Sequence, residues 1–217
     1  WNWILRMLSE SEPPNEDLAA WFSNQIELWL DKYLSELEQP GFLEPLHWYP
    51  YTVGERVSNT CIFFYLTGYR PSDKIVKGLE KQVQYLSDHL EFQGNKTGNH
   101  VVNNARALYI AGCFLKCKGW RELASAIFEN EVPKHITEDG FFREGSSHYH
   151  FLYTRWLLEL YYFSHIFEDL KIKKFLAPIC VRMLQQCNFF LVNDEQGNRR
   201  IPLFGDISPD FPPNWLT

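Results

Sequence analysis

Asn99 and His100 stand side by side in TGNHVVNNARALYIAG, residues 97–112, directly before an amphipathic run. Because they follow Gly98 and precede a helical pattern, Asn99 is predicted to be the N-cap of a helix. A helix N-terminus carries unpaired N–H groups and a partial positive charge, which suits a carboxylate ligand. The amide and the imidazole would add two hydrogen-bonding side chains to such a site. The alternative is that Asn99 only caps the helix and His100 only packs.

A second group of reactive side chains lies in DGFFREGSSHYHFLYTRW, residues 139–156, where His148, Tyr149 and His150 follow a turn of small residues. A serine of this turn is predicted to cap a helix, which places Tyr149 in the first helical turn with a histidine diverging on either side. Such histidines do not easily share a metal, since metal ligands on a helix favour a spacing of four. A nucleophilic serine is unsupported, because no GxSxG elbow follows a strand. The alternative is a polar, aromatic helix start without chemistry.

Two further stretches place charged residues near predicted turns. In WYPYTVGERVSN, Glu55 and Arg56 begin a helix after an aromatic loop, and an arginine there could hold an anionic sugar through two parallel hydrogen bonds. A solvated ion pair is the alternative. In IPLFGDISPDF, Asp206 follows a glycine turn, a position that aspartate often takes for local reasons.

The composition favours a protein with a large aromatic core. Of the 217 residues, 45% are hydrophobic and 17% are aromatic, which suits wide helix–helix interfaces or a groove that stacks on sugar rings. The formal net charge of −6 argues against a nucleic-acid partner, which normally requires a basic stripe, while a locally basic groove could still bind an anion. The sequence has no apolar run of about 18 residues, so no membrane span is predicted.

The five cysteines predict buried thiols rather than a zinc cluster. They form no CxxC pair and lie within helical or apolar patterns, whereas a zinc site needs closer pairing with histidines. No metal ligand set and no cofactor site are therefore predicted within this chain. The cysteines are Cys61, Cys113, Cys117, Cys180 and Cys187.

The elements that must position these residues are helices, because apolar residues recur at three and four residues almost throughout. Stops such as QPGF and TGYRPSD separate the helices. Successive helices of this kind predict an all-α fold of stacked antiparallel hairpins, in a bundle, a solenoid or an (α/α) toroid. The predicted helices cover residues 16–38, 52–67, 73–91, 100–117, 120–136, 147–168 and 171–191, with a short strand or turn at RRIPLF.

Three stretches together resemble one known family. GNHVVNNARALYIAG, ITEDGFFREGSSHYH and IPLFGD, in this order and at roughly these separations, resemble the helical domain of the heparinase II/III-like polysaccharide lyases. That family shows a helix of the form N-A-x-A-L-x-x-A-G, then D-G-x-x-x-E-x-S-x-x-Y-H, and later P-x-F-G-D. HWYPYTVGERVSN similarly resembles its aromatic loop and arginine-bearing helix, so the resemblance spans roughly residues 45–206. The residues that match the second motif are Asp139, Gly140, Glu144, Ser146, Tyr149 and His150.

The resemblance implies a fold, a reaction and a partner. The fold is an incomplete (α/α) toroid over residues 1–217, and in the full-length protein a C-terminal antiparallel β-sandwich is expected to follow it. The activity is β-elimination on an anionic polysaccharide that contains uronic acids, such as a glycosaminoglycan or alginate, in a bacterium. A further catalytic histidine or tyrosine and any metal site would come from the β domain. The localisation is left open between periplasm and cytoplasm.

The resemblance also implies roles for particular residues. Asn99 with His100 would neutralise the uronate carboxylate, and Tyr149 would act as acid, or as acid and base, at the glycosidic oxygen. Abstraction of the C5 hydrogen places more charge on that carboxylate, and each good donor that stabilises it is worth roughly 3–4 kcal/mol. Asn99 and Tyr149 are therefore expected within about 15 Å of each other. The implied substrate-binding residues are Arg56, Glu144, His148, His150, Trp48 and Tyr51, of which the two histidines would orient or polarise Tyr149.

Two departures and two alternatives accompany this interpretation. Arg143 stands where an apolar or aromatic residue is expected, and Ser147 where proline is common. One alternative is an (α/α)-barrel glycoside hydrolase, with Glu55 or Glu144 paired with Asp206 at a separation of roughly 5–9.5 Å. The other is a helical module that binds polysaccharide without catalysis.

Overall fold

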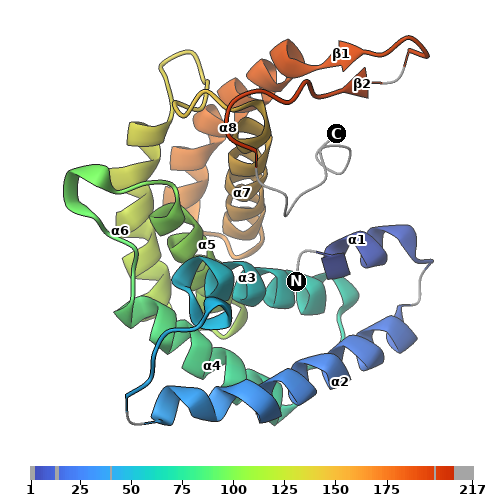
Figure 1. The fold of residues 1–217 in the computed structure, drawn as a ribbon, viewed down its shortest axis with the longest axis vertical. Coiled ribbons are helices and arrows are strands. Elements are labelled where there is room, and N and C mark those ends of the chain that lie inside the picture. The colour runs from blue at the N-terminus through green and yellow to red at the C-terminus, as the bar shows by residue number, and fades with distance from the viewer. Residues whose placement is uncertain (1–2, 13–14, 40, 198, 208–217) are drawn as a thin grey trace. The chain divides into compact units, whose positions relative to one another are not determined.

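A computed structural model describes residues 3–12, 15–39, 41–197 and 199–207 of the chain. Within these ranges the chain is almost entirely helical, which confirms the all-α prediction (Figure 1). None of the helices in the described ranges is both long and apolar enough to cross a membrane. The elements are α1 (Trp3–Glu10), α2 (Glu16–Tyr33), η1 (Leu34–Glu38), η2 (Leu46–Trp48), α3 (Pro50–Thr67), α4 (Asp73–Asp88), η3 (Gly94–Lys96), α5 (His100–Phe114), α6 (Lys118–His135), α7 (Ser147–Ile166), α8 (Leu170–Phe190), β1 (Val192–Asn193) and β2 (Arg199–Arg200), where η marks a 3-10 helix.

The chain divides into two compact units, and the division falls inside α6. Unit 1 comprises Trp1–Ser125 and unit 2 comprises Ala126–Thr217. Asn99 and His100 belong to unit 1, whereas Tyr149 belongs to unit 2. Each unit is described by itself below.

All seven predicted helices are present, with differences at their ends. The helix predicted over 16–38 ends at Tyr33 and continues as the 3-10 turn η1. The helix predicted to run to residue 91 ends at Asp88, because the backbone N–H of Glu91 donates to the side chain of Asn104 instead of continuing the helix. Helix α1 was not predicted, although its apolar residues have helical spacing. The short strand or turn predicted at RRIPLF is present in part, since Arg199–Arg200 form β2, which pairs antiparallel with β1.

Helices α3 and α5 form the centre of unit 1. Every residue from 53 to 64 in α3 and from 101 to 113 in α5 is buried, so both helices are covered on all sides. Their close approach depends on Gly54, since a Cβ at that position would lie 3.0 Å from Nδ2 of Asn103. Helices α2 and α4 pack around this pair.

A buried ion pair joins these two central helices. Nη1 of Arg106 lies 2.7 Å from Oε1 of Glu55, and the arginine side chain is fully buried. The same nitrogen donates to Oδ1 of Asn103 at 2.9 Å, while Asn59 donates to the second carboxylate oxygen at 3.1 Å. Both charges are therefore compensated, as buried charges must be if they are not to destabilise the fold.

Helices α7 and α8 form an antiparallel hairpin in unit 2, where they lie side by side (Figure 1). A three-residue link, residues 167–169, reverses the chain between them. An apolar cluster made of Phe151, Cys187, Phe190 and Ile201 joins the two helices to the segment after β2. We call residues 201–207 the closing segment, because they return to the start of α7.

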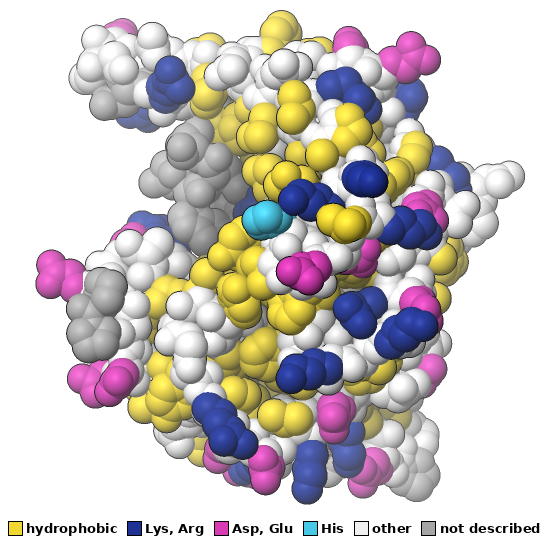
Figure 2. Space-filling model, turned by 180° about the vertical axis from the view of Figure 1, so that it is seen from behind, with side chains coloured by type: hydrophobic (Ala, Val, Ile, Leu, Met, Phe, Trp, Pro, Cys, Tyr) yellow, Lys and Arg dark blue, Asp and Glu magenta, His cyan; other side chains and the backbone are white. Residues whose placement is uncertain are grey.

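Charged side chains of both signs are interspersed with hydrophobic ones on the face of the molecule in Figure 2. The chain also has exposed ion pairs, for example Lys118 with Glu122 at 3.1 Å. The formal net charge of −6 is thus not concentrated in one acidic area of that face.

The buried ion pair predicts a large difference between two charge deletions. Arg106→Ala should lower the free energy of unfolding by about 3–5 kcal/mol, because Glu55 would be left buried and unpaired. Lys118→Ala removes a cation from an exposed pair and should cost less than about 1 kcal/mol. Urea unfolding of both variants measures the difference, and equal losses would show that the buried pair is not needed.

Candidate functional site

Asn99 occupies the N-cap position of α5, but its side chain does not cap the helix. The predicted capping bond is wrong because the backbone of Asn99 is helical, with φ −65° and ψ −18°, whereas a capping residue normally has an extended backbone. Asn99 is buried, with 6% of its surface exposed, yet within the described ranges no hydrogen bond to its side-chain amide is found. The amide is therefore available to a ligand at the positive end of the helix.

His100 stands next to Asn99 with half of its side chain exposed. Its Nδ1 lies 2.9 Å from Oε1 of Glu91, in the link that precedes α5. Its ring centroid lies 4.8 Å from that of Tyr51, at the start of α3. The backbone oxygen of Tyr51 in turn accepts from Nδ2 of Asn103 at 3.1 Å. The structure thus brings together three predicted residues, Asn99, His100 and Tyr51, and adds Glu91, for which the sequence pattern gives no signal.

Arg56 and Trp48, predicted to bind substrate, are both buried in unit 1. The guanidinium of Arg56 lies 4.0 Å from the ring centroid of Trp29 and 5.4 Å from that of Trp48. It donates to Oε1 of Gln82 at 2.6 Å and to the backbone oxygen of His47 at 2.8 Å. Burial lowers the pKa of Arg56 to about 9. Here both side chains hold the aromatic loop in place, and their direct contact with a substrate stays a prediction.

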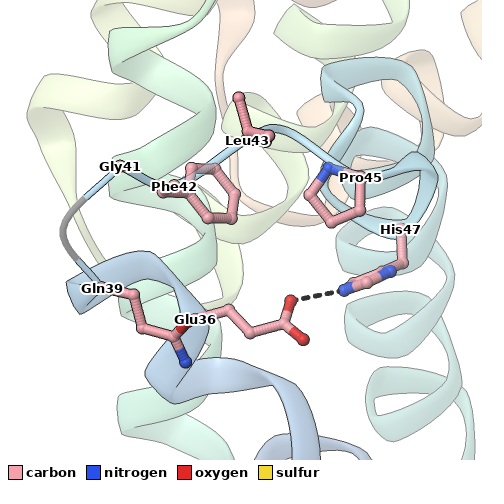
Figure 3. A pocket seen from close by; sticks show the side chains of 7 residues that line it. All are labelled: Glu36, Gln39, Gly41, Phe42, Leu43, Pro45 and His47. Carbon is pink, nitrogen blue, oxygen red and sulfur yellow. Dashed lines mark hydrogen bonds and ion pairs between the residues drawn. The ribbon is translucent and has the colours of Figure 1, made fainter.

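A pocket of about 360 Å³ opens beside this loop, and no predicted site residue lines it (Figure 3). The carboxylate of Glu36 accepts from Nε2 of His47 at 2.7 Å and from Nε1 of Trp48 at 3.0 Å. A carboxylate in the wall suits a neutral or cationic group better than a uronate. The sequence signal for this pocket is the aromatic connector LEPLHWYPY. The lining residues are Glu36, Gln39, Gly41, Phe42, Leu43, Pro45 and His47.

Tyr149 lies in the first turn of α7, as predicted. Oγ of Ser146 accepts from the backbone N–H of Tyr149 at 3.0 Å, which confirms the predicted serine cap. The Tyr149 side chain is half-buried, and its ring meets the ring of His148 edge-on with centroids 5.9 Å apart. His148 is fully buried, whereas Glu144 in the preceding turn is exposed.

His150 is a buried bridge rather than a surface group. Its Nδ1 accepts from the backbone N–H of Phe142 at 3.3 Å, so Nε2 carries the hydrogen and donates to the backbone oxygen of Met183 at 3.1 Å. Desolvation by burial lowers the pKa of His150, against the opposite effect of the bond to Met183. Because both ring nitrogens are engaged with backbone atoms, His150 supports the start of α7 and does not face a ligand.

The closing segment binds the start of α7 through backbone atoms. Oγ of Ser147 donates to the backbone oxygen of Pro202 at 2.7 Å, and the backbone N–H of Ser147 donates to the oxygen of Phe204 at 3.2 Å. Oγ of Ser146 donates to the backbone oxygen of Asp206. The second and third motifs therefore form one structure, although the sequence suggested only a local turn at Asp206.

Gly205 is required where the closing segment crosses this turn. It has φ +75°, and a Cβ would lie 2.7 Å from the backbone oxygen of Gly145. Only glycine combines that backbone conformation with such a close approach of two chain segments.

No group of three or more histidine, cysteine, aspartate or glutamate side chains in the described ranges is arranged to hold a metal. All five cysteines are free thiols, and burial raises the pKa of Cys180 to about 12. Four of them are buried as predicted, while Cys117 is half-buried. Buried thiols of this kind act as packing groups rather than nucleophiles.

Comparison with known proteins identifies the family of this chain. The sequence matches the family described as Heparinase II/III N-terminus over residues 14–211. The structure is similar to the crystal structure of heparan sulfate lyase HepC from Pedobacter heparinus, with a TM-score of 0.61 and 20% identity over 85% of this chain and 30% of that chain. A mutant of that lyase gives a TM-score of 0.58 and 20% identity over 88% and 31% of the two chains. No curated protein matches the sequence.

This likeness confirms the predicted fold class, the all-α hairpins of the (α/α) toroid type. At 20% identity it speaks for the fold and not for the substrate. The chain spans less than a third of the length of the solved lyases, since it covers 30% and 31% of their chains.

The turn at Gly205 yields a matched pair of substitutions. Gly205 and Gly197 both have positive φ, at +75° and +80°, but a Cβ at Gly197 would meet nothing within 4 Å. Gly197→Ala should therefore cost about 1–2 kcal/mol of backbone strain. Gly205→Ala should cost clearly more and should speed amide hydrogen exchange in the first turn of α7. Equal costs and an unchanged exchange rate would mean that the closing segment does not hold this turn.

The burial of His150 predicts a pH dependence of stability. The unfolded ring takes up a proton near pH 6.5, while the folded ring has a lowered pKa and resists it, so stability should fall as pH drops below about 6.5. His150→Asn should lower the free energy of unfolding by about 1–3 kcal/mol at pH 8 and give a shallower decline towards pH 5. Urea unfolding at several pH values tests this. His135, whose pKa burial also lowers, is present in both proteins, so parallel curves would contradict the assignment to His150.

Proposed function

This chain belongs to the heparinase II/III family, and we propose that it is the helical, substrate-binding part of a lyase that cleaves uronic-acid polysaccharides by β-elimination. The observation that carries the proposal is the start of α5. There, the side-chain amide of Asn99, which makes no capping bond, and the half-exposed ring of His100 lie together at a helix N-terminus. A carboxylate is the ligand that such an arrangement suits.

The carboxylate of the uronate is the group that has to be stabilised. When a base removes the C5 proton, the electron pair of that bond moves onto the carboxylate and gives an enolate-like intermediate. The amide of Asn99 and the ring of His100 would donate to this developing charge, together with the backbone N–H groups of α5. The C4–C5 double bond then forms as the glycosidic C4–O bond breaks.

Tyr149 would supply the proton for the departing oxygen. Its place in the first turn of α7 supports this role, since Ser146 holds its backbone and the closing segment holds Ser146. His148 and His150 would act from behind it as positioning residues, because both are buried. The proposal requires that Asn99 and Tyr149 come within about 15 Å of each other when substrate is bound.

The other predicted residues divide by exposure. Tyr51 and Glu144 keep exposed surface and are assigned to direct contact with the substrate. Trp48 and Arg56 are buried and are assigned to holding the aromatic loop. The chain covers 30% of the HepC chain. Following the family resemblance, we propose that the remaining catalytic groups, and any metal site, belong to a β-rich domain of the full-length protein.

The glycoside hydrolase alternative loses one of its candidate carboxylates. Both oxygens of Glu55 accept hydrogen bonds, from Arg106 and from Asn59, within the α3–α5 interface. A carboxylate committed in this way does not deliver a proton to a glycosidic oxygen. Glu144 with Asp206 is then the pair that a hydrolase would have to use.

Two substitutions in the full-length protein test the proposal. Asn99→Ala removes one donor to the intermediate and should lower kcat by about 10²–10³. Tyr149→Phe removes the proton donor and should lower kcat by about 10²–10⁴, with little change in KM. The ultraviolet absorbance of the unsaturated product measures the rate on uronic-acid polysaccharides.

Two matched controls are available, one on the turn before α5 and one on α7. Asn95→Ala, on the exposed turn η3, and Tyr162→Phe, on the exposed face of α7, should leave the rate unchanged. Full activity in both Asn99→Ala and Tyr149→Phe would refute the lyase assignment. New reducing ends without an unsaturated product would favour the hydrolase. Oligosaccharide binding without turnover, unaffected by Tyr149→Phe, would favour a binding module.

A further inference from the structure

Glu91 contacts two residues of α5 from the link between α4 and α5. Its Oε1 lies 2.9 Å from Nδ1 of His100, and its Oε2 accepts from Nδ2 of Asn104 at 3.0 Å. In return, Oδ1 of Asn104 accepts the backbone N–H of Glu91 at 3.0 Å. The Glu91 side chain is 13% exposed, Asn104 is buried and the His100 side chain is 51% exposed. A fixed, largely buried carboxylate therefore holds an exposed ring.

These bonds determine where the hydrogen of the His100 ring lies. Asn104 uses its oxygen for the Glu91 backbone, so its NH₂ group must face the carboxylate. A carboxylate only accepts, so Nδ1 of His100 must carry the hydrogen in the bond between them. The two nitrogens of an imidazole flank Cε1 and their hydrogen-bonding directions diverge, so Nε2 points away from Glu91.

From this geometry we infer that Glu91 is a positioning residue of the proposed uronate site: it accepts the hydrogen on Nδ1 of His100, so that the charged ring presents its second hydrogen, on Nε2, to the bound carboxylate. The inference rests on the proposed function for the identity of the ligand. The carboxylate of Glu91 also favours the positively charged ring. A charged donor at Nε2 binds a uronate more strongly than a neutral donor would.

The surroundings of the ring are consistent with Glu91 as the source of this effect. Tyr51 of α3 contacts the ring of His100 through its own ring. Of the buried charged groups of α3 and α5, Glu55 and Arg106 are paired with each other, while the guanidinium of Arg56 lies against the rings of Trp29 and Trp48.

Glu91→Gln tests this inference because the hydrogen bonds between residue 91 and Asn104 allow only one orientation of the new amide. If the glutamine oxygen faces the NH₂ group of Asn104, its own NH₂ group faces Nδ1 of His100, which must then accept. The opposite orientation sets two NH₂ groups against each other. The hydrogen of His100 should therefore move to Nε2.

A second substitution should reverse the effect. In Glu91→Gln/Asn104→Asp the new carboxylate can accept both the backbone N–H and the glutamine NH₂ group. The glutamine oxygen then faces His100 again and restores the hydrogen to Nδ1. The double variant also restores the net charge of the pair, so it separates the hydrogen-bond pattern from the total charge.

Nitrogen NMR of the full-length protein, labelled with ¹⁵N in histidine, reads out the tautomer directly. The signals of His100 are identified by their absence in His100→Gln, at a pH where the ring is neutral. We expect hydrogen on Nδ1 in the wild type, on Nε2 in Glu91→Gln and on Nδ1 in the double variant. Hydrogen on Nε2 in the wild type, or no change in the folded single variant, overturns the inference. If the single variant does not fold, the wild type and the double variant decide.

Binding separates this inference from the proposed function. Glu91→Gln should weaken binding of a uronic-acid oligosaccharide roughly tenfold, leave binding of its carboxyl-reduced counterpart unchanged, and be rescued in the double variant. Equal weakening for both oligosaccharides overturns the role of Glu91 towards the carboxylate. If the tautomers change as expected but the wild type binds no uronate, the proposed function fails while the control of His100 by Glu91 stands.

Discussion

The buried pair of Glu55 and Arg106 is the constraint on which unit 1 depends. Helices α3 and α5 are covered on all sides, and a charge in such an interface destabilises the fold by several kcal/mol unless its partner is in place. Apolar side chains alone would tolerate a shift of one helix along the other, whereas this pair does not. Asn103 connects this ion pair to the start of α3, since its side chain accepts a hydrogen bond from Arg106 and donates one to the backbone oxygen of Tyr51. The starts of both helices, with His100 beside Tyr51, are thereby fixed by a contact in the core.

The start of α7 is held differently, by polar side chains that form hydrogen bonds with backbone atoms. In REGSSHYH, Ser146, Ser147 and His150 all bind main-chain atoms. A stretch that looks rich in reactive groups is therefore mostly structural, and its side chains with exposed surface are those of Arg143, Glu144 and Tyr149. The buried histidines on either side of Tyr149 matter because they fix its position.

Sequence patterns predicted what depends on neighbours along the chain. The periodicity gave the seven long helices, and the GSS turn gave the cap at Ser146, since both are local effects. The end of α4 and the role of Glu91 were missed because they depend on Asn104, thirteen residues away, whose sequence position reads as plain helix interior. Asn99 was placed at the right position but with the wrong side-chain contact, because its backbone is helical. The family resemblance identified candidate residues, while their contacts required the fold.

The helix start around Tyr149 depends on the closing segment, which is synthesised later than α7. The partners of Ser147 lie 55 and 57 residues further along the sequence. A ribosome adds about 5–20 residues per second, whereas helices form within about a microsecond, so α7 exists for seconds before these partners emerge. During that interval the α7–α8 hairpin can form, but its first turn lacks the contacts that hold it. The turn that presents Tyr149 is thus among the last parts of unit 2 to become ordered during synthesis.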